Sequence, residues 1–225
     1  MFLAMLVCGL VCNQPTTMTV TAEAAPQAKA HTHFILVPGD KNIRPTNALY
    51  MAVAKSVARG LTADGFEEAK SPDDADLVVV VDWMVSDPKL SMHHAGGDVG
   101  APAVSGAAAG GKGGMPVGGT TNHAAFGFGM EGGERSDYSW VRTYLVSGVD
   151  RAAFKADPKA KPLWAIKVDS EGDTDDVSKA APAVMAGAIP YVGQTTAPKG
   201  VHFRMGAQED SVKYVRGDIQ APVKK

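Results

Sequence analysis

The sequence predicts an α+β fold, a two-layer sandwich with a mainly antiparallel sheet and two helices on one of its faces. Residues 77–81 read Leu and then four valines; because this run is apolar on both faces, it indicates a central strand. Residues 138–147 alternate large aromatic with small or aliphatic side chains, which favours one long strand. Helical patterns are few and are separated by several strands. This order argues against a doubly wound nucleotide-binding fold.

Alternation and turn residues delimit the other strands. A Gly-Asp pair follows the apolar run His33–Pro38, and a Ser-Pro-Asp-Asp turn precedes the valine-rich strand. A short strand is expected to start at Gly65-Phe66. The expected strands, in chain order, are residues 33–38, the short strand from 65, then 75–85, 137–147, 163–168 and 201–205.

Two segments carry helical periodicity. The first is expected to run from a cap at Thr46 to Gly60, with apolar residues every four positions between them. The second runs from Val177 to Pro190 and is rich in alanine and valine. Pro182 lies inside it, where proline costs about 3 kcal/mol in a straight helix. We therefore expect this second helix to be kinked or split.

Composition limits the function classes. The 225 residues are 45% hydrophobic, enough to bury a core, and carry Lys+Arg 22 against Asp+Glu 24. The formal net charge of −2 and the scattered basic residues give no patch that would grip nucleic acid. No apolar run reaches the roughly 18 residues that a membrane-spanning helix needs.

The amino-terminal residues 1–24 have the character of an export signal. Phe2–Val11 is an apolar run of the length of a signal-peptide hydrophobic region. Two processing routes remain open: cleavage after Ala24, in a small-x-small sequence, or lipid attachment at Cys12, directly after the apolar run. A buried terminal strand or helix is the alternative. Residues 25–32, at the end of a Thr-, Ala- and Pro-rich stretch, are expected to be a tether.

The body is predicted to be a single domain over residues 33–205, with a polar tail at 206–225. Within it, residues 95–133 hold 14 of the 25 glycines in 39 residues. Such a composition buries too little apolar surface to offset an ordering entropy of about 1–2 kcal/mol per residue. We interpret it as a long flexible insertion between two strands, either disordered or ordered by a partner.

Several of these strings resemble one family. Gly65-Phe66, a turn and residues 75–79 resemble an uncharacterised family of bacterial envelope lipoprotein domains, as does the Leu163-Trp164 strand with its acidic turn and the small-residue helix ending at Pro190. The resemblance covers residues 33–190. It implies a short exported protein with one α+β domain of unknown function, and it brings no catalytic residues.

The densest group of charged residues is at 169–176, with five carboxylates in eight residues. A calcium-binding EF-hand loop would need glycine at its sixth position and glutamate at its twelfth, whereas Gly172 is fourth and Ala180 is twelfth. We interpret Asp173 as the cap of the following helix, with the other carboxylates near its positive end. Weak calcium binding is the alternative.

Other reactive constellations are missing. Both cysteines, Cys8 and Cys12, precede the body, and the sequence lacks the Gly-x-Ser-x-Gly, His-Glu-x-x-His and Ser-x-x-Lys motifs. We predict no metal and no cofactor, and expect the histidines on the surface; a metal-binding loop is the weaker alternative, through His93, His94 and His123. The aromatic face of Tyr138, Trp140 and Tyr144 is expected to be core, with stacking on sugars or bases as the alternative.

These patterns favour a non-catalytic exported domain, periplasmic or membrane-anchored in the bacterial cell envelope, that binds another envelope protein or a cell-wall component. A periplasmic hydrolase is the alternative, with a site assembled from distant Asp and His residues, for example a deep pocket in which His202 or Asp82 lies beside a second carboxylate. Sequence spacing alone does not decide between them.

Overall fold

The structure is a computed structural model that describes residues 16–28, 30–93 and 135–220. The chain divides into two compact units, residues 1–89 with 138–225, and residues 90–137. The elements, in chain order, are β1 (Thr16–Ala24), β2 (His33–Pro38), α1 (Ala48–Asp64), β3 (Glu67–Glu68), β4 (Leu77–Val85), β5 (Lys89–His93), β6 (Arg135–Asp150), α2 (Arg151–Ala156), β7 (Trp164–Gly172), α3 (Val177–Ala188), the 3₁₀ turn η1 (Ile189–Tyr191), β8 (Val201–Met205) and α4 (Asp210–Arg216).

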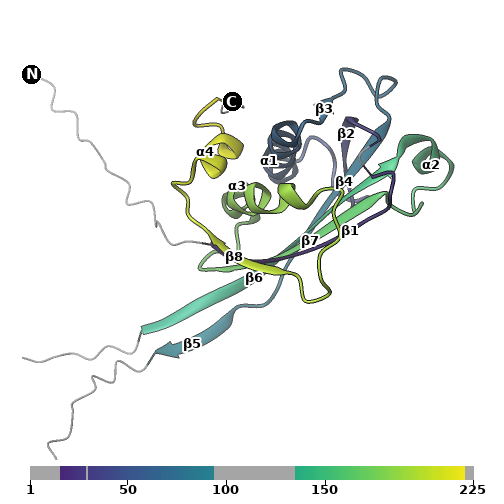
Figure 1. Ribbon diagram of the computed structural model, residues 1–225. Helices are drawn as coiled ribbons and strands as arrows, with labels where there is room; N and C mark the ends of the chain where they lie inside the picture. Colours follow the sequence, from purple (N-terminus) through teal and green to yellow (C-terminus); the bar gives the residue numbers. More distant parts are fainter. Residues whose placement is uncertain (1–15, 29, 94–134, 221–225) are drawn as a thin grey trace, which may run out of the picture. The chain divides into compact units, whose positions relative to one another are not determined.

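The α+β class and the mainly antiparallel sheet are confirmed. The strand order is β3-β2-β4-β6-β7-β1-β8, with β5 paired to β6. β2 runs parallel to β3 and β4, and the other neighbours along this order are antiparallel. Helices α1, α3 and α4 lie on the same side of the sheet, while α2 lies at the end of the β4 and β6 strands (Figure 1).

The valine-rich strand β4 is central, as predicted. It pairs with β2 on one side and β6 on the other. Its adjacent residues Val78 and Val79 are 2% and 0% exposed although they point to opposite faces. Val79 faces the helices and belongs to the core that lies between them and the sheet.

Alternate residues of β6 and β7 also line this core. Tyr144 lies opposite Val168 and Val146 opposite Ile166, and these four side chains are buried. The indole of Trp164 lies over Gly148, its partner on β6, where an added Cβ would overlap the ring. Glycine is therefore needed at position 148 because a large aromatic ring approaches the backbone.

The amino-terminal boundary of the domain was predicted wrongly. β1 is an internal strand, hydrogen-bonded to β7 on one side and β8 on the other. Met18, Val20 and Ala22 alternate with threonines, face the core and are no more than 1% exposed. Residues 16–24 therefore belong to the folded domain, which does not start at residue 33. The period of two was present in the sequence, but its small and polar residues resembled a tether.

The carboxyl-terminal boundary also needs correction. α4 lies within the segment 206–225 that was expected to be a polar tail, and it buries Val212 and Val215. α2 is likewise an addition to the two helices expected. It has no buried residue, so no apolar period marked it in the sequence.

The two predicted helices form, with corrected ends. Asn47, one residue after the expected Thr46, caps α1, and Gly65 ends the helix at a φ of +104°. Gly60 is inside the helix, where an added Cβ would overlap Ile189. α3 continues through Pro182; it is not split, because eight other residues of this helix are buried and hold it in place.

The position of β1 gives a direct prediction. A chain that starts at Ala25 lacks a strand whose three buried side chains fill the core, so we expect it to be unfolded in circular dichroism and thermal melts. A chain that starts at Asn13 keeps β1 and should melt cooperatively. Equal melting of the two chains would contradict the placement of β1.

Candidate functional site

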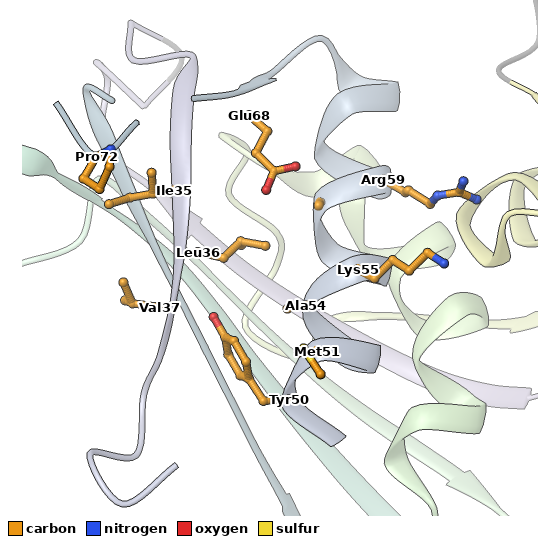
Figure 2. A pocket seen from close by; sticks show the side chains of 11 residues that line it. Ile35, Leu36, Val37, Tyr50, Met51, Ala54, Lys55, Arg59, Glu68 and Pro72 are labelled. Atoms are coloured by element: carbon orange, nitrogen blue, oxygen red, sulfur yellow. The ribbon is translucent and has the colours of Figure 1, made fainter. Parts of the chain in front are cut away.

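The candidate functional site is a groove between β2 and α1 of about 680 Å³. One wall is Ile35–Val37 of β2, and the other is the exposed side of α1 (Figure 2). Glu68, from β3, lies at one end of the groove and Tyr50, from the first turn of α1, lies nearer the other (Figure 2). The groove is therefore built on two regular elements.

The outer edge of β2 is open along this groove. The carbonyls of Thr32 and Phe34 accept hydrogen bonds from the N–H groups of Glu67 and Ala69, at 2.9 and 2.8 Å. Even-numbered residues of β2 therefore face β3, and odd-numbered ones face β4. β3 pairs only as far as Phe34. Within the described residues, the N–H and C=O of Leu36 consequently have no strand partner.

Pro38 limits this open edge. It is the last residue of β2 and, like Leu36, it faces away from β4. Proline has no N–H to donate, although its carbonyl still accepts. The open edge therefore offers one donor and one acceptor at Leu36 and a further acceptor at Pro38. Unpaired strand edges of this kind are templates for another strand.

Tyr50 brings a buried hydroxyl to the groove. The Asn47 side chain accepts from the N–H groups of Leu49 and Tyr50 at 2.9 and 3.1 Å and so fixes the first turn of α1. Tyr50 is 4% exposed, yet its Oη has no hydrogen-bond partner among the described residues. Figure 2 shows its hydroxyl pointing toward β2.

Burial also changes the acidity of this phenol. Desolvation raises the pKa of Tyr50 from 10.0 to about 12, because the surroundings disfavour the phenolate. Tyr50 is therefore a neutral hydrogen-bond donor at physiological pH. An unpaired buried hydroxyl typically costs about 1–3 kcal/mol, so this side chain favours any occupant that supplies an acceptor.

The rim of the groove carries an apolar side chain and one inward-pointing charge. Met51 is 51% exposed on α1. The Lys55 and Arg59 side chains extend away from β2, whereas the Glu68 carboxylate points into the groove (Figure 2). Arg59 also donates from Nη1 to the Tyr214 carbonyl at 3.1 Å. Lys55 and Arg59 also line the groove, so its walls are mostly apolar, its α1 rim carries two cations directed outward, and its β3 end carries one inward carboxylate.

A buried arginine lies elsewhere, beneath the turn that leads into α3. Arg142 is 2% exposed and donates to the Thr174 carbonyl at 3.0 Å and to Ser170 Oγ at 3.2 Å. Its Nε has no partner among the described residues. These bonds hold the turn against β6 and β7, which is a structural role.

The acidic cluster at 169–176 is part of the fold. Asp176, not the expected Asp173, caps α3 by accepting from the Ser178 N–H at 3.0 Å. The hydrogen bond from the Ser178 hydroxyl is the main cause that lowers the pKa of Asp176. Asp169 accepts from Thr143 Oγ1 at 2.6 Å and pairs with Lys167 at 2.8 Å.

No metal site is formed by the part of the chain that the structure describes: no three His, Cys, Asp or Glu side chains there are placed to hold an ion. His31 lies 3.7 Å from Asp150, and His33 lies 3.5 Å from Glu67. The metal-loop alternative rests on His93, His94 and His123, and the side chains of all three lie outside the described residues, as does the whole of Cys12.

The two residues of the hydrolase alternative lie far apart. Asp82 is on β4 and His202 on β8, with β6, β7 and β1 between them. Four strand spacings of about 4.8 Å separate them by roughly 19 Å. Asp82 accepts from the Trp83 N–H at 2.8 Å, and His202 Nδ1 lies 2.7 Å from Thr19 Oγ1. Neither residue lines the groove, and neither has a second carboxylate among its hydrogen-bond or ion-pair partners in the described residues.

The aromatic face of β6 divides into two parts. Tyr144 is fully buried and donates to the Val177 carbonyl at 2.6 Å, so it is core as predicted. Tyr138 is 52% exposed, and its ring centroid lies 6.2 Å from that of Trp140. The expectation of a wholly buried face is therefore wrong for Tyr138, which extends past the residues covered by α3.

Comparison with known proteins finds neither a matching family model nor a matching curated protein. Among solved structures, a PDZ domain protein from Parabacteroides distasonis is 12% identical with a TM-score of 0.42, over 85% of this chain and 40% of that one. A PelC dodecamer from Paraburkholderia phytofirmans is 10% identical with a TM-score of 0.39, over 80% of this chain and 99% of that one. This chain thus spans less than half of the first structure.

The sequence reasoning did not identify the groove. Tyr50 and Met51 lie in a helix whose apolar period marked the core, and Leu36 lies in an ordinary apolar strand. One sequence signal was present: the short strand after Gly65 is interrupted by Lys70 and Pro72. A two-residue β3 cannot cover six residues of β2, and that mismatch exposes the edge.

Two tyrosines give a matched test of this site. Tyr50→Phe removes a hydroxyl without a partner, so the free energy of unfolding should stay the same or rise. Tyr144→Phe leaves the Val177 carbonyl unpaired and should lose about 1–3 kcal/mol, lowering Tm by several degrees. Thermal melts at neutral pH compare the two variants.

The same variants have a pH signature. The pKa of an unfolded tyrosine is 10.0, whereas the pKa of folded Tyr50 is raised to about 12. The stability that the neutral phenol contributes is therefore fully present below pH 10 and is lost as the pH rises toward 12, because the unfolded chain ionises first. Tyr50→Phe should reduce this alkaline loss. A large loss of stability in Tyr50→Phe at neutral pH would contradict the absence of a partner for its hydroxyl.

Proposed function

We propose that this protein is a non-catalytic exported domain of the bacterial cell envelope that binds another envelope protein through the groove between β2 and α1. The observation that carries the proposal is the coincidence of an open strand edge at Leu36 with the unpartnered, buried hydroxyl of Tyr50. Both groups lack hydrogen-bond partners within the described chain; Leu36 and the Tyr50 side chain line the same groove, with the Tyr50 oxygen buried at its wall. Polar groups left unpaired in this way favour a binding partner that completes them.

The chemistry of the groove supports binding over catalysis. Its inward polar groups are one neutral phenol and the carboxylate of Glu68, beside aliphatic side chains and Met51. General acid–base or nucleophilic catalysis needs an activated group within hydrogen-bond reach of a base. Neither Tyr50 nor Glu68 has such a neighbour among the described residues. No particular observation favours the hydrolase alternative.

The position of β1 bears on which of the two processing routes is compatible with the fold. Cleavage after Ala24 would remove the whole strand, whereas processing at Cys12 would leave it intact. We therefore favour lipid attachment at Cys12, followed by the folded domain from residue 16. None of the helices in the described ranges combines the length and apolar character needed to cross a bilayer.

In this proposal the two-layer α+β sandwich is a scaffold. The groove presents the binding surface. The predicted Gly-rich insertion at 95–133 lies outside the described residues. The resemblance of residues 33–190 to envelope lipoprotein domains supports the same compartment.

Site-directed photo-crosslinking tests the proposal. A photoreactive amino acid replaces Met51, which is 51% exposed at the groove, or Met84, which is 56% exposed on the opposite side of the sheet. In cells that make the chain naturally, position 51 should form one discrete adduct with an envelope protein, because that side chain lines the groove. Mass spectrometry of the envelope fraction identifies the adduct.

Position 84 serves as the matched control, because its exposure is similar and it does not line the groove. Equal adducts at 51 and 84, or none at 51, would contradict binding through the groove. Recovery of the chain in the cytoplasm, with Met1 still present by intact mass, would contradict export.

A further inference from the structure

We propose that the occupant of the groove is an extended polypeptide segment that adds one strand to the sheet at the outer edge of β2. The inference rests on the proposed function and names the chemical class of the partner. Leu36 presents a backbone N–H and C=O on the same edge, and Pro38 presents a second carbonyl two residues later. An extended backbone carries donors and acceptors at that spacing, as in other cases of strand addition.

The added strand continues the line where β3 stops. β3 pairs with His33 and Phe34 in parallel, and the Ala69 N–H makes the last bond, to the Phe34 carbonyl. Beyond this point the chain leaves the edge, and Pro72 lines the groove. The next positions on the edge belong to Leu36 and Pro38, beside the empty groove volume.

Tyr50 provides a hydrogen bond for the same segment. Its hydroxyl points toward the β2 edge from the helix side (Figure 2). A strand next to β2 directs half of its carbonyls toward β2 and half away from it. We assign the Tyr50 hydroxyl as a donor to a polar side chain on the α1-facing side of the segment, because the carbonyls of an added strand lie in the plane of the sheet. This bond satisfies a group that is unpaired in the free protein.

The side chains of the segment follow from the groove walls. Positions facing α1 meet Tyr50, Met51 and Ala54, so a large apolar side chain fits there. The Glu68 carboxylate points inward at the other end. None of the ion pairs among the described residues includes Glu68, so a lysine or arginine of the segment fits beside it. The proposed ligand is thus an extended peptide with an apolar residue and a basic residue.

Peptide selection against the full-length chain tests this inference. Random 12-residue peptides displayed on phage are selected on the wild-type chain, with counter-selection on Met51→Asp, and the recovered sequences are synthesised. Fluorescence anisotropy should show that Tyr50→Phe weakens binding about 2- to 12-fold, the loss of one hydrogen bond. Tyr191→Phe, on η1 and outside the groove, is the matched control and should bind like wild type.

Backbone N-methylation of the peptide separates strand addition from other modes. Methylation should weaken binding about tenfold or more at two positions that are two residues apart, where the N–H groups would reach Leu36 and Pro38. Methylation of the residue between them, whose N–H faces away from β2, should have little effect. A charge swap tests the contact between Glu68 and the basic residue of the peptide. Glu68→Lys should weaken binding of the original peptide, and a peptide with glutamate in place of its basic residue should bind Glu68→Lys better than the original peptide does.

The other possible results would overturn either strand addition alone or binding in the groove as a whole. Peptides that need Tyr50 but tolerate N-methylation at every position, or that bind as helices by circular dichroism, would overturn strand addition and leave the groove as a binding site. Recovery of no peptide sensitive to Met51→Asp would overturn both the inference and the proposed function. Micromolar self-association in sedimentation, lost in Met51→Asp, would replace the separate peptide by a second copy of the chain.

Discussion

The helix-facing side of the sheet is buried from β1 to β4, where alternate side chains of β1, β4, β6 and β7 pack beneath α1 and α3. Each fully buried aliphatic or aromatic side chain contributes about 1.5–3 kcal/mol, so this layer supplies most of the stability. The other features follow from it. β1 lies between β7 and β8, where its apolar face packs into this core. The apolar face of α1 packs into the same core from the helix layer.

The groove is a consequence of the same arrangement. α1 buries Val53, Val57 and Leu61 in the core, and Tyr50 in its first turn lines the groove beside β2. A longer β3 would have covered the β2 edge beneath this turn, but β3 ends at Glu68. The protein therefore keeps an unpaired edge at Leu36, and the nearby Pro38 shortens that edge, as in proteins that limit unwanted strand pairing. A short edge flanked by a donor on the helix is suited to one specific segment.

Much of the fold was predictable from the sequence, because hydrophobic periodicity reports burial directly. The Val78–Val81 run marked the central strand, and the His33–Pro38 strand was predicted with its correct ends. The prediction failed where burial was carried by small residues or by few residues. Met18, Val20 and Ala22 alternate with threonines and resembled a tether, and α4 buries only Val212 and Val215. The cap of α3 was predicted at Asp173 instead of Asp176, because several nearby carboxylates fit the residue preference of a helix cap equally well.

The site was less predictable, for a physical reason. Leu36 and Tyr50 are chemically ordinary, and their role depends on the absence of partners, which a sequence does not record. The most direct test of this account is amide hydrogen exchange at Leu36, measured by NMR with and without a saturating groove-binding peptide. We predict fast exchange in the free chain, slow exchange for the neighbouring Ile35 and Val37 that face β4, and strong protection of Leu36 on binding. A Leu36 amide as protected as Val37 in the free chain, or unchanged by the peptide, would contradict the open edge on which the account depends.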